Sequence, residues 1–120
     1  MEASKRFLRT AVIYCRVYSW EHKKSYSLEE QEKIAMDFAS QNGYRVLKVF
    51  LETEQSGKNF ERPQLQAMLK YLDEHPWRVK FLLLSDMDRL CCSPSGLKRI
   101  RRFLRLSGVK VISVLQSLLK

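Results

Sequence analysis

The feature that most constrains the fold is the regular alternation of short apolar runs with longer amphipathic segments along the chain. Four runs are rich in β-branched and other apolar residues, and we expect strands over residues 11–17, 44–52, 79–85 and 109–114. The segments between them carry apolar residues at helical spacing, which predicts three helices. A β-α-β-α-β-α-β order with short loops is typical of an α/β fold, with a mainly parallel sheet of about four strands and helices on both faces.

The three predicted helices have clear start and stop signals. A serine followed three residues later by a glutamate is a capping box, and proline is favoured in a first helical turn. Glycine is common directly after a helix end. The start signals are Ser27 with Glu30, Pro63, and Ser93-Pro94. The stop signals are Asn42-Gly43 and Gly108.

Length and composition indicate a single domain. One hundred and twenty residues are enough to bury a core without metal or disulfide staples. The N-terminus does not have the form of a signal peptide, and no stretch is long enough to span a membrane, so we expect a cytoplasmic protein. Three cysteines, including the vicinal pair Cys91-Cys92, make a poor disulfide framework and show no zinc spacing with the histidines. We therefore expect reduced thiols and no metal.

The positive charge is concentrated in the second half of the chain. Residues 1–75 hold 12 Lys/Arg and 11 Asp/Glu, whereas residues 76–120 hold 10 Lys/Arg and two acids, within a net charge of +9. A basic half suggests a nucleic-acid partner, but it is also compatible with a solvated face that has no specific partner. Lys98, Arg101 and Arg102 of the third predicted helix allow the same two interpretations: they contact nucleic-acid phosphates, or they form a solvated face without a partner. Trp20 and Trp77 are expected to pack in the core or in loops.

Three polar features follow the predicted strands, at residues 16–19, 52–57 and 86–89. The carboxyl ends of parallel strands lie at one edge of a sheet, where ligands bind, so we expect the three features to converge. Arginines, a carboxylate and a hydroxyl are the parts of a phosphodiester site, because guanidinium groups match phosphate oxygens and neutralise developing charge. The alternative is an internal ion pair between Arg16 and Asp88 that only fixes the fold.

Five short motifs occur in order along residues 10–114, and together they carry a family resemblance. They are Tyr14-x-Arg16-Val17, Ser25-Tyr26-Ser27-Leu28-Glu29-x-Gln31, Ser56-Gly57 with Arg62-Pro63-x-Leu65, Asp86-x-Asp88-Arg89-Leu90, and Gly108-Val109-x-Val111-Ile112-Ser113. With these motifs the chain resembles the N-terminal catalytic domain of serine recombinases. This is the resolvase and invertase family, and the likeness is greatest to its large-serine-recombinase and transposon branches.

The resemblance implies a fold, a chemistry and a set of partners. The expected fold is the resolvase-like three-layer arrangement, as a single domain over residues 1–120 with its core at about 10–114. In that family a serine attacks a DNA phosphodiester and forms a 5′-phosphoserine link, with no metal or nucleotide cofactor. The implied partners are DNA and other recombinase subunits of a mobile element such as a transposon or phage, with no membrane. The implied site residues are Arg16, Asp88 and Arg89 in the active site, and Gln31, Ser56 and Arg62 as supporting or DNA-contacting residues.

Two departures from the family pattern place catalysis in doubt. The nucleophilic serine position is Tyr18, and the ungapped spacing from Tyr14 to Gln31 does not shift Ser19 into its place. Ser19 also points to the opposite side if the strand continues. Further along, Cys92 replaces a phosphate-binding arginine. The loss of one transition-state cation typically costs on the order of 10²–10³ in rate.

Three functions therefore stay open from the sequence. The first is a recombinase catalytic domain with an impaired site, and the second is an active recombinase that uses Tyr18 or Ser19 as nucleophile. The third is a non-catalytic module that binds DNA phosphates weakly or regulates an active recombinase. The dimerisation helix and DNA-binding domain of the family are expected to be absent from these 120 residues.

Overall fold

The structure is a computed structural model that describes residues 9–18, 26–54, 62–90 and 93–118, without the side chains of residues 18 and 54. Its elements are β1 (Thr10–Tyr18), α2 (Leu28–Asn42), β2 (Arg45–Glu54), α3 (Pro63–Glu74), β3 (Phe81–Leu84), the 3₁₀ helix η2 (Met87–Arg89), α4 (Pro94–Leu106), β4 (Lys110–Ser113) and the one-turn helix α5 (Val114–Ser117). The four predicted strands and three predicted helices are confirmed. The two shortest helices, η2 and α5, were not predicted.

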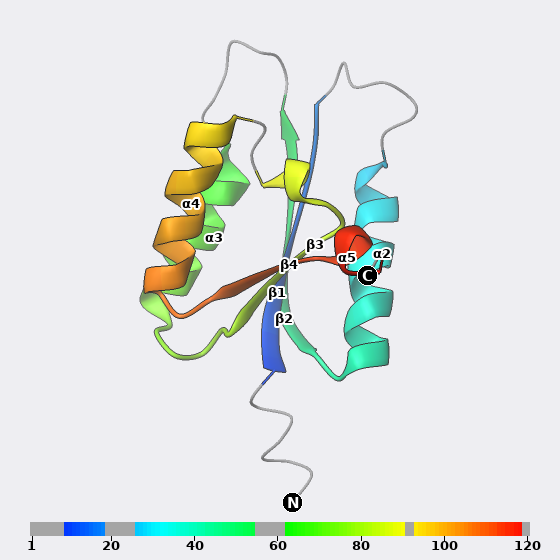
Figure 1. The fold of residues 1–120 in the computed structure, drawn as a ribbon, viewed down its shortest axis with the longest axis horizontal. Helices are drawn as coiled ribbons and strands as arrows, with labels where there is room; N and C mark the ends of the chain where they lie inside the picture. Colours follow the sequence, from blue (N-terminus) through cyan, green and yellow to red (C-terminus); the bar gives the residue numbers. More distant parts are fainter. Residues whose placement is uncertain (1–8, 19–25, 55–61, 91–92, 119–120) are drawn as a thin grey trace, which may run out of the picture.

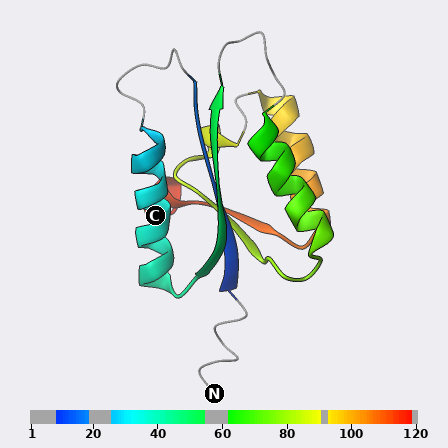
Figure 2. The same ribbon diagram turned by 180° about the vertical axis from the view of Figure 1, so that it is seen from behind.

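The sheet has the order β2-β1-β3-β4, and every pair of neighbouring strands is parallel. Helices α3 and α4 cover one face, and α2 and α5 cover the other (Figure 1; Figure 2 gives the view from behind). This arrangement confirms the predicted α/β fold with helices on both faces of a parallel sheet. None of the helices within the described ranges is both long and apolar enough to cross a membrane.

Strand β1 supplies both halves of the core, because successive side chains point to opposite faces of a sheet. Val12 and Tyr14 belong to the cluster under α3 and α4, whereas Ile13 and Cys15 belong to the cluster under α2. Strand β3 is apolar throughout and almost completely buried, as expected for a strand covered on both faces.

The predicted capping signals set the helix ends. The Ser27 hydroxyl accepts a hydrogen bond from the Glu30 N–H at 3.0 Å, and the Glu30 carboxylate accepts one from the Ser27 N–H at 2.8 Å. Gly43 ends α2 with a φ of 76°, a conformation that glycine adopts without steric cost. Pro63 and Pro94 stand in the first turns of α3 and α4. As a result, α3 and α4 begin beside the carboxyl edge of the sheet.

Candidate active site

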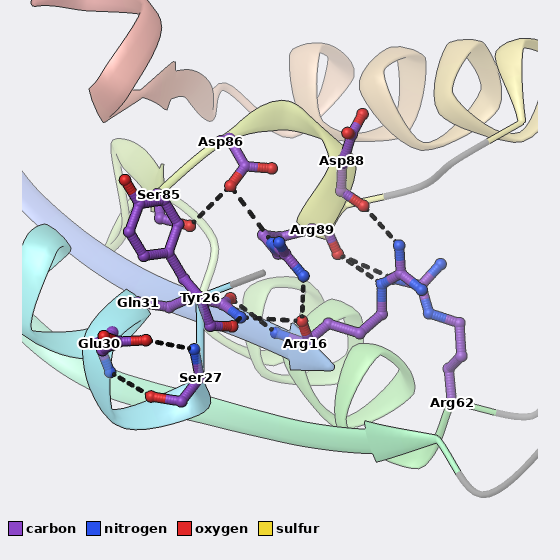
Figure 3. Close-up of polar contacts among 10 residues, drawn as sticks. All are labelled: Arg16, Tyr26, Ser27, Glu30, Gln31, Arg62, Ser85, Asp86, Asp88 and Arg89. Atoms are coloured by element: carbon purple, nitrogen blue, oxygen red, sulfur yellow. Dashed lines mark hydrogen bonds and ion pairs between the residues drawn. The ribbon is translucent and has the colours of Figure 1, made fainter. Parts of the chain in front are cut away.

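Arg16 lies near the end of β1 and is held in place through its main chain. Its N–H donates to Gln31 Oε1 at 3.1 Å, and Gln31 Nε2 donates back to the Arg16 carbonyl at 3.0 Å. Gln31 lies on the buried side of α2 and also donates to the carbonyl of Tyr26 at 3.0 Å (Figure 3). A single glutamine therefore satisfies both main-chain polar groups of Arg16 and ties β1 to the start of α2.

Arg16 is 2% exposed, and its guanidinium donates to main-chain carbonyl groups of η2. Its Nε donates to the Arg89 carbonyl at 2.9 Å, and its Nη2 donates to the Asp88 carbonyl. In return, Arg89 Nη1 donates to the Arg16 carbonyl at 2.9 Å. Each arginine thus binds the main chain of the other, which joins the ends of β1 and β3.

Arg62 reaches the same carbonyl groups from the other side of the site. It is the N-cap of α3 and has a φ of 46°, in the left-handed region. Its Nη2 lies 3.0 Å from the Tyr14 hydroxyl and 3.4 Å from the Arg89 carbonyl oxygen, and it also donates to the Leu90 carbonyl. Arg16 and Arg62 therefore share the Arg89 oxygen. We call Arg16, Arg62 and Arg89 the arginine cluster.

Two aspartates lie beside the arginine cluster and differ in position. Asp86 Oδ2 accepts from Arg89 Nε at 3.3 Å and from the Ser85 hydroxyl at 3.2 Å. Asp88 is exposed, and its carboxylate points away from the Arg16 guanidinium (Figure 3). Arg16 contacts Asp88 through the main-chain carbonyl. Asp86 therefore supplies a carboxylate that pairs with an arginine of the cluster.

Glu52 forms a buried link beneath Arg62. It is 1% exposed, and its carboxylate accepts from the N–H of Gln64 at 3.0 Å, from the N–H of Leu65 at 2.8 Å and from the Tyr14 hydroxyl at 2.9 Å. Burial raises the pKa of Tyr14 well above its ordinary value, although Arg62 acts in the opposite direction. Tyr14 therefore stays a neutral hydroxyl, which donates to Glu52 and accepts from Arg62.

Cys15 lies beside Arg16 but on the opposite face of β1. It is buried, and burial raises the pKa of its thiol to about 12, with a smaller contribution from Glu32 and an opposing one from Arg89. A thiol attacks as its thiolate, so Cys15 is a poor candidate for a nucleophile. Within the described ranges, no group of three or more His, Cys, Asp or Glu side chains is placed to hold a metal ion.

The structure brings together five of the predicted site residues: Arg16, Gln31, Arg62, Asp88 and Arg89. Ser19, Ser56 and Cys92 lie outside the described residues, and Tyr18 is described only as the last residue of β1. Lys98, Arg101 and Arg102 lie on α4 and line a groove beside β4. The sequence interpretation included Glu52 in the polar feature at residues 52–57 and Tyr14 in a family motif, but it gave neither residue a role in the site. The available signal was a glutamate at the end of an apolar strand.

Comparison with known proteins gives one family and several similar folds. The family described as "Resolvase, N terminal domain" matches residues 11–118. The C-terminal catalytic domain of ISC1926 TnpA, an IS607-like serine recombinase, is 31% identical, with a TM-score of 0.73 over 88% of this chain and 67% of that chain. No curated protein sequence matches the chain.

Two further solved structures share the fold at lower identity. The N-terminal catalytic domain of TP901-1 integrase is 23% identical, with a TM-score of 0.75 over 91% of this chain and 79% of that chain. A resolvase family site-specific recombinase from Streptococcus pneumoniae is 24% identical, with a TM-score of 0.77 over 90% of this chain and 73% of that chain.

Proposed function

The chain belongs to the family of resolvase N-terminal domains, and from this premise we propose that it binds a DNA phosphodiester at its arginine cluster but cleaves it inefficiently. The observation that carries the proposal is that Arg16 and Arg62 donate to one carbonyl oxygen, with Arg89 bound to Arg16. Three cations are thereby gathered at the carboxyl edge of a parallel sheet, the usual ligand-binding edge of this fold class.

A phosphate suits this arrangement on electrostatic grounds. Like charges at such short separation repel, and an anion between them relieves the repulsion. The planar fork of a guanidinium matches phosphate oxygens, and the cluster holds three such groups at one edge of the sheet. Arg62 is half-buried, whereas Arg16 and Arg89 are buried. We therefore propose that Arg62 makes the first contact with the phosphate. Arg16 and Arg89 then contribute positive electrostatic potential beneath it.

The expected chemistry is attack by a hydroxyl oxygen on phosphorus. A bond forms between that oxygen and the phosphorus, the bond to the 3′ oxygen breaks, and the arginines stabilise the charge that develops. Tyr18 stands where the family has serine, and a tyrosine carries its hydroxyl group beyond an aromatic ring, much further from the main chain than a serine does. Misplacement by roughly 1 Å already costs a large factor in rate. The replacement of arginine by Cys92 removes a further cation, so we propose that cleavage is impaired.

The binding half of the proposal is tested by fluorescence anisotropy with labelled duplex DNA over a range of salt concentrations. We expect Arg62→Gln to weaken binding about tenfold at low salt and to reduce the salt slope by about one. Arg78→Gln is the matched control, because Arg78 is exposed and lies in the turn before β3, at the opposite edge of the sheet. Equal losses of affinity in the two variants would mean that DNA binding depends only on the net charge of the protein and not on the arginine cluster.

The catalytic half is tested by trapping covalent adducts on a nicked DNA substrate. We expect little adduct with the natural chain and more with the double variant Tyr18→Ser, Cys92→Arg. An adduct formed by the natural chain and lost in Tyr18→Phe or Ser19→Ala would identify a working substitute nucleophile and contradict the proposed impairment. If DNA does not bind even at low salt, a non-catalytic module that acts on another recombinase subunit becomes the better assignment.

A further inference from the structure

A groove of about 1050 Å³ lies between α4 and β4, away from the arginine cluster. Residues of α4 form one wall, and residues 108–111, at the start of β4, form the other. The lining contains no Asp or Glu, and half of its twelve residues are basic: Lys98, Arg99, Arg101, Arg102, Arg105 and Lys110. Leu97, Val109 and Val111 add apolar surface. The groove therefore combines one sign of charge with an apolar lining.

The β4 wall is the edge of the sheet. Strand β4 is last in the strand order and pairs with β3, and no strand of the described ranges pairs with its other edge. The Lys110 N–H donates to the Lys80 carbonyl at 2.9 Å, so the main-chain groups of Lys110 face inward. Because successive residues of a strand alternate, the N–H and C=O of Val111 point outward along this edge. An open strand edge is a template for a further strand.

We propose that the α4–β4 groove is a docking site for an acidic, extended segment of a partner protein, which pairs with β4 as an added strand. Successive side chains of such a strand point to opposite faces of the sheet, and α4 covers one of those faces. Acidic residues at every second position would then face the basic side chains of α4, including Arg101 and Arg105. Their carboxylates complement the charge of the groove, and the main chain satisfies the outward groups of Val111.

Two other occupants fit the groove less well. A second copy of this chain that paired β4 with β4 would bring Lys110 and the arginines of α4 against the same cations, which is unfavourable. A nucleic acid would neutralise the cations, but its phosphates do not match the alternating N–H and C=O groups of a strand edge or the apolar side chains Leu97 and Val109. The proposal does not rest on the proposed function, since no residue of the arginine cluster lines the groove.

The test uses the 120-residue chain and three labelled octapeptides of alternating sequence, measured by fluorescence anisotropy. The first alternates glutamate and valine, and the second replaces glutamate by lysine. The third is the first with an N-methyl group on every amide, so that neither of its edges can donate to a strand. We expect the first peptide to bind at least tenfold more tightly than the other two. In an amide NMR spectrum, its binding should slow hydrogen exchange at the Val111 N–H.

Arg101→Glu and Arg78→Glu make the same change of charge at exposed positions, inside and outside the groove. We expect the first variant to weaken peptide binding at least tenfold and the second less than twofold, with unchanged circular dichroism spectra. Arg62→Gln should leave peptide binding unchanged, which separates this proposal from the proposed function. Equal binding of the N-methylated peptide would overturn strand addition, as would equal binding of the lysine peptide. If Arg101→Glu loses duplex DNA binding and Arg78→Glu does not, the groove is a nucleic-acid site instead. If the chain dimerises through β4 in a concentration-dependent way, the groove is an interface with a second copy.

Discussion

Arg16 lies near the end of a buried strand with almost no exposed surface, and its charge is stabilised by main-chain oxygens. Burying an unpaired cation costs several kcal/mol, but Arg16 donates to the carbonyl groups of Asp88 and Arg89. Gln31 satisfies the main-chain groups of the same residue. At the residue scale, the site is therefore a set of arginines whose side chains also fix the path of the chain after β3.

Glu52 offers a direct test of the link beneath Arg62. Its two carboxylate oxygens accept three hydrogen bonds, whereas a glutamine has one acceptor oxygen and would turn an NH₂ group toward a main-chain N–H of α3. We expect Glu52→Gln to lower the free energy of unfolding by about 1–2 kcal/mol, measured by urea denaturation. Glu29→Gln is the control, because Glu29 is exposed in the first turn of α2 and should cost less than about 0.5 kcal/mol. Equal losses would argue against a special role for the buried carboxylate.

Cys15 gives the fold a pH dependence at alkaline pH. Burial raises its pKa from 9.0 to about 12, so the unfolded chain loses this proton first as the pH rises. The stabilisation from the buried neutral thiol is fully present below pH 9 and is lost as the pH rises toward 12. Between pH 8 and pH 10.5 we expect the loss of unfolding free energy to be about 1–2 kcal/mol smaller in Cys15→Ala than in the natural chain. The same loss in both proteins would show that the thiol does not titrate differently on folding.

At the scale of elements, the turn between α3 and β3 is strained. Trp77 has a φ of 70° and is 79% exposed, so it lies in a loop, one of the two expected places, but its side chain is not packed there. The turn is closed by a hydrogen bond from the Arg78 N–H to the His75 carbonyl at 3.1 Å. A residue with a Cβ in the left-handed region costs roughly 1–2 kcal/mol, and little packing around Trp77 offsets that cost.

Replacing Trp77 by glycine should therefore stabilise the protein. Relief of the left-handed strain exceeds the extra freedom that glycine gives the unfolded chain, and we expect a gain of about 0.5–1 kcal/mol in urea denaturation. Arg78→Gly is the matched control, because the φ of Arg78 is not positive, and it should lower the stability by a similar amount. A loss in both variants would mean that the Trp77 side chain makes stabilising contacts in solution.

Periodicity and capping signals predicted the long elements, because each depends on residues that are close in sequence. Helices η2 and α5 are too short to show a period, so no pattern marks them. The position of Arg16 at the carboxyl edge followed from its place near a strand end. Its partners did not, because the bonds to the carbonyl groups of residues 88 and 89 are set by how β1 meets η2 in space. For the same reason, the sequence could not pair Glu52 with Tyr14.

At the scale of the whole molecule, the two core clusters lie on opposite faces of the sheet. The cluster under α3 and α4 includes Leu104, and the cluster under α2 includes Ala35 and Ala39. Strand β1 places alternate side chains in both clusters and pairs with both β2 and β3. Loss of one cluster removes half of the support of the central strand, so we expect the two faces to unfold together.

Leu104→Ala tests this coupling. Leu104 is fully buried, and its truncation should lower the free energy of unfolding by about 2–5 kcal/mol. If the molecule unfolds as one unit, native-state hydrogen exchange of the Ala35 and Ala39 amides in α2 should accelerate by the same free energy, although α4 lies on the opposite face. Leu106→Ala is the control, because Leu106 is 74% exposed and its truncation should change exchange by less than about 0.5 kcal/mol. Unchanged protection of α2 in Leu104→Ala would show instead that the helical layers open independently, and that the arginine cluster between them is held by its hydrogen bonds alone.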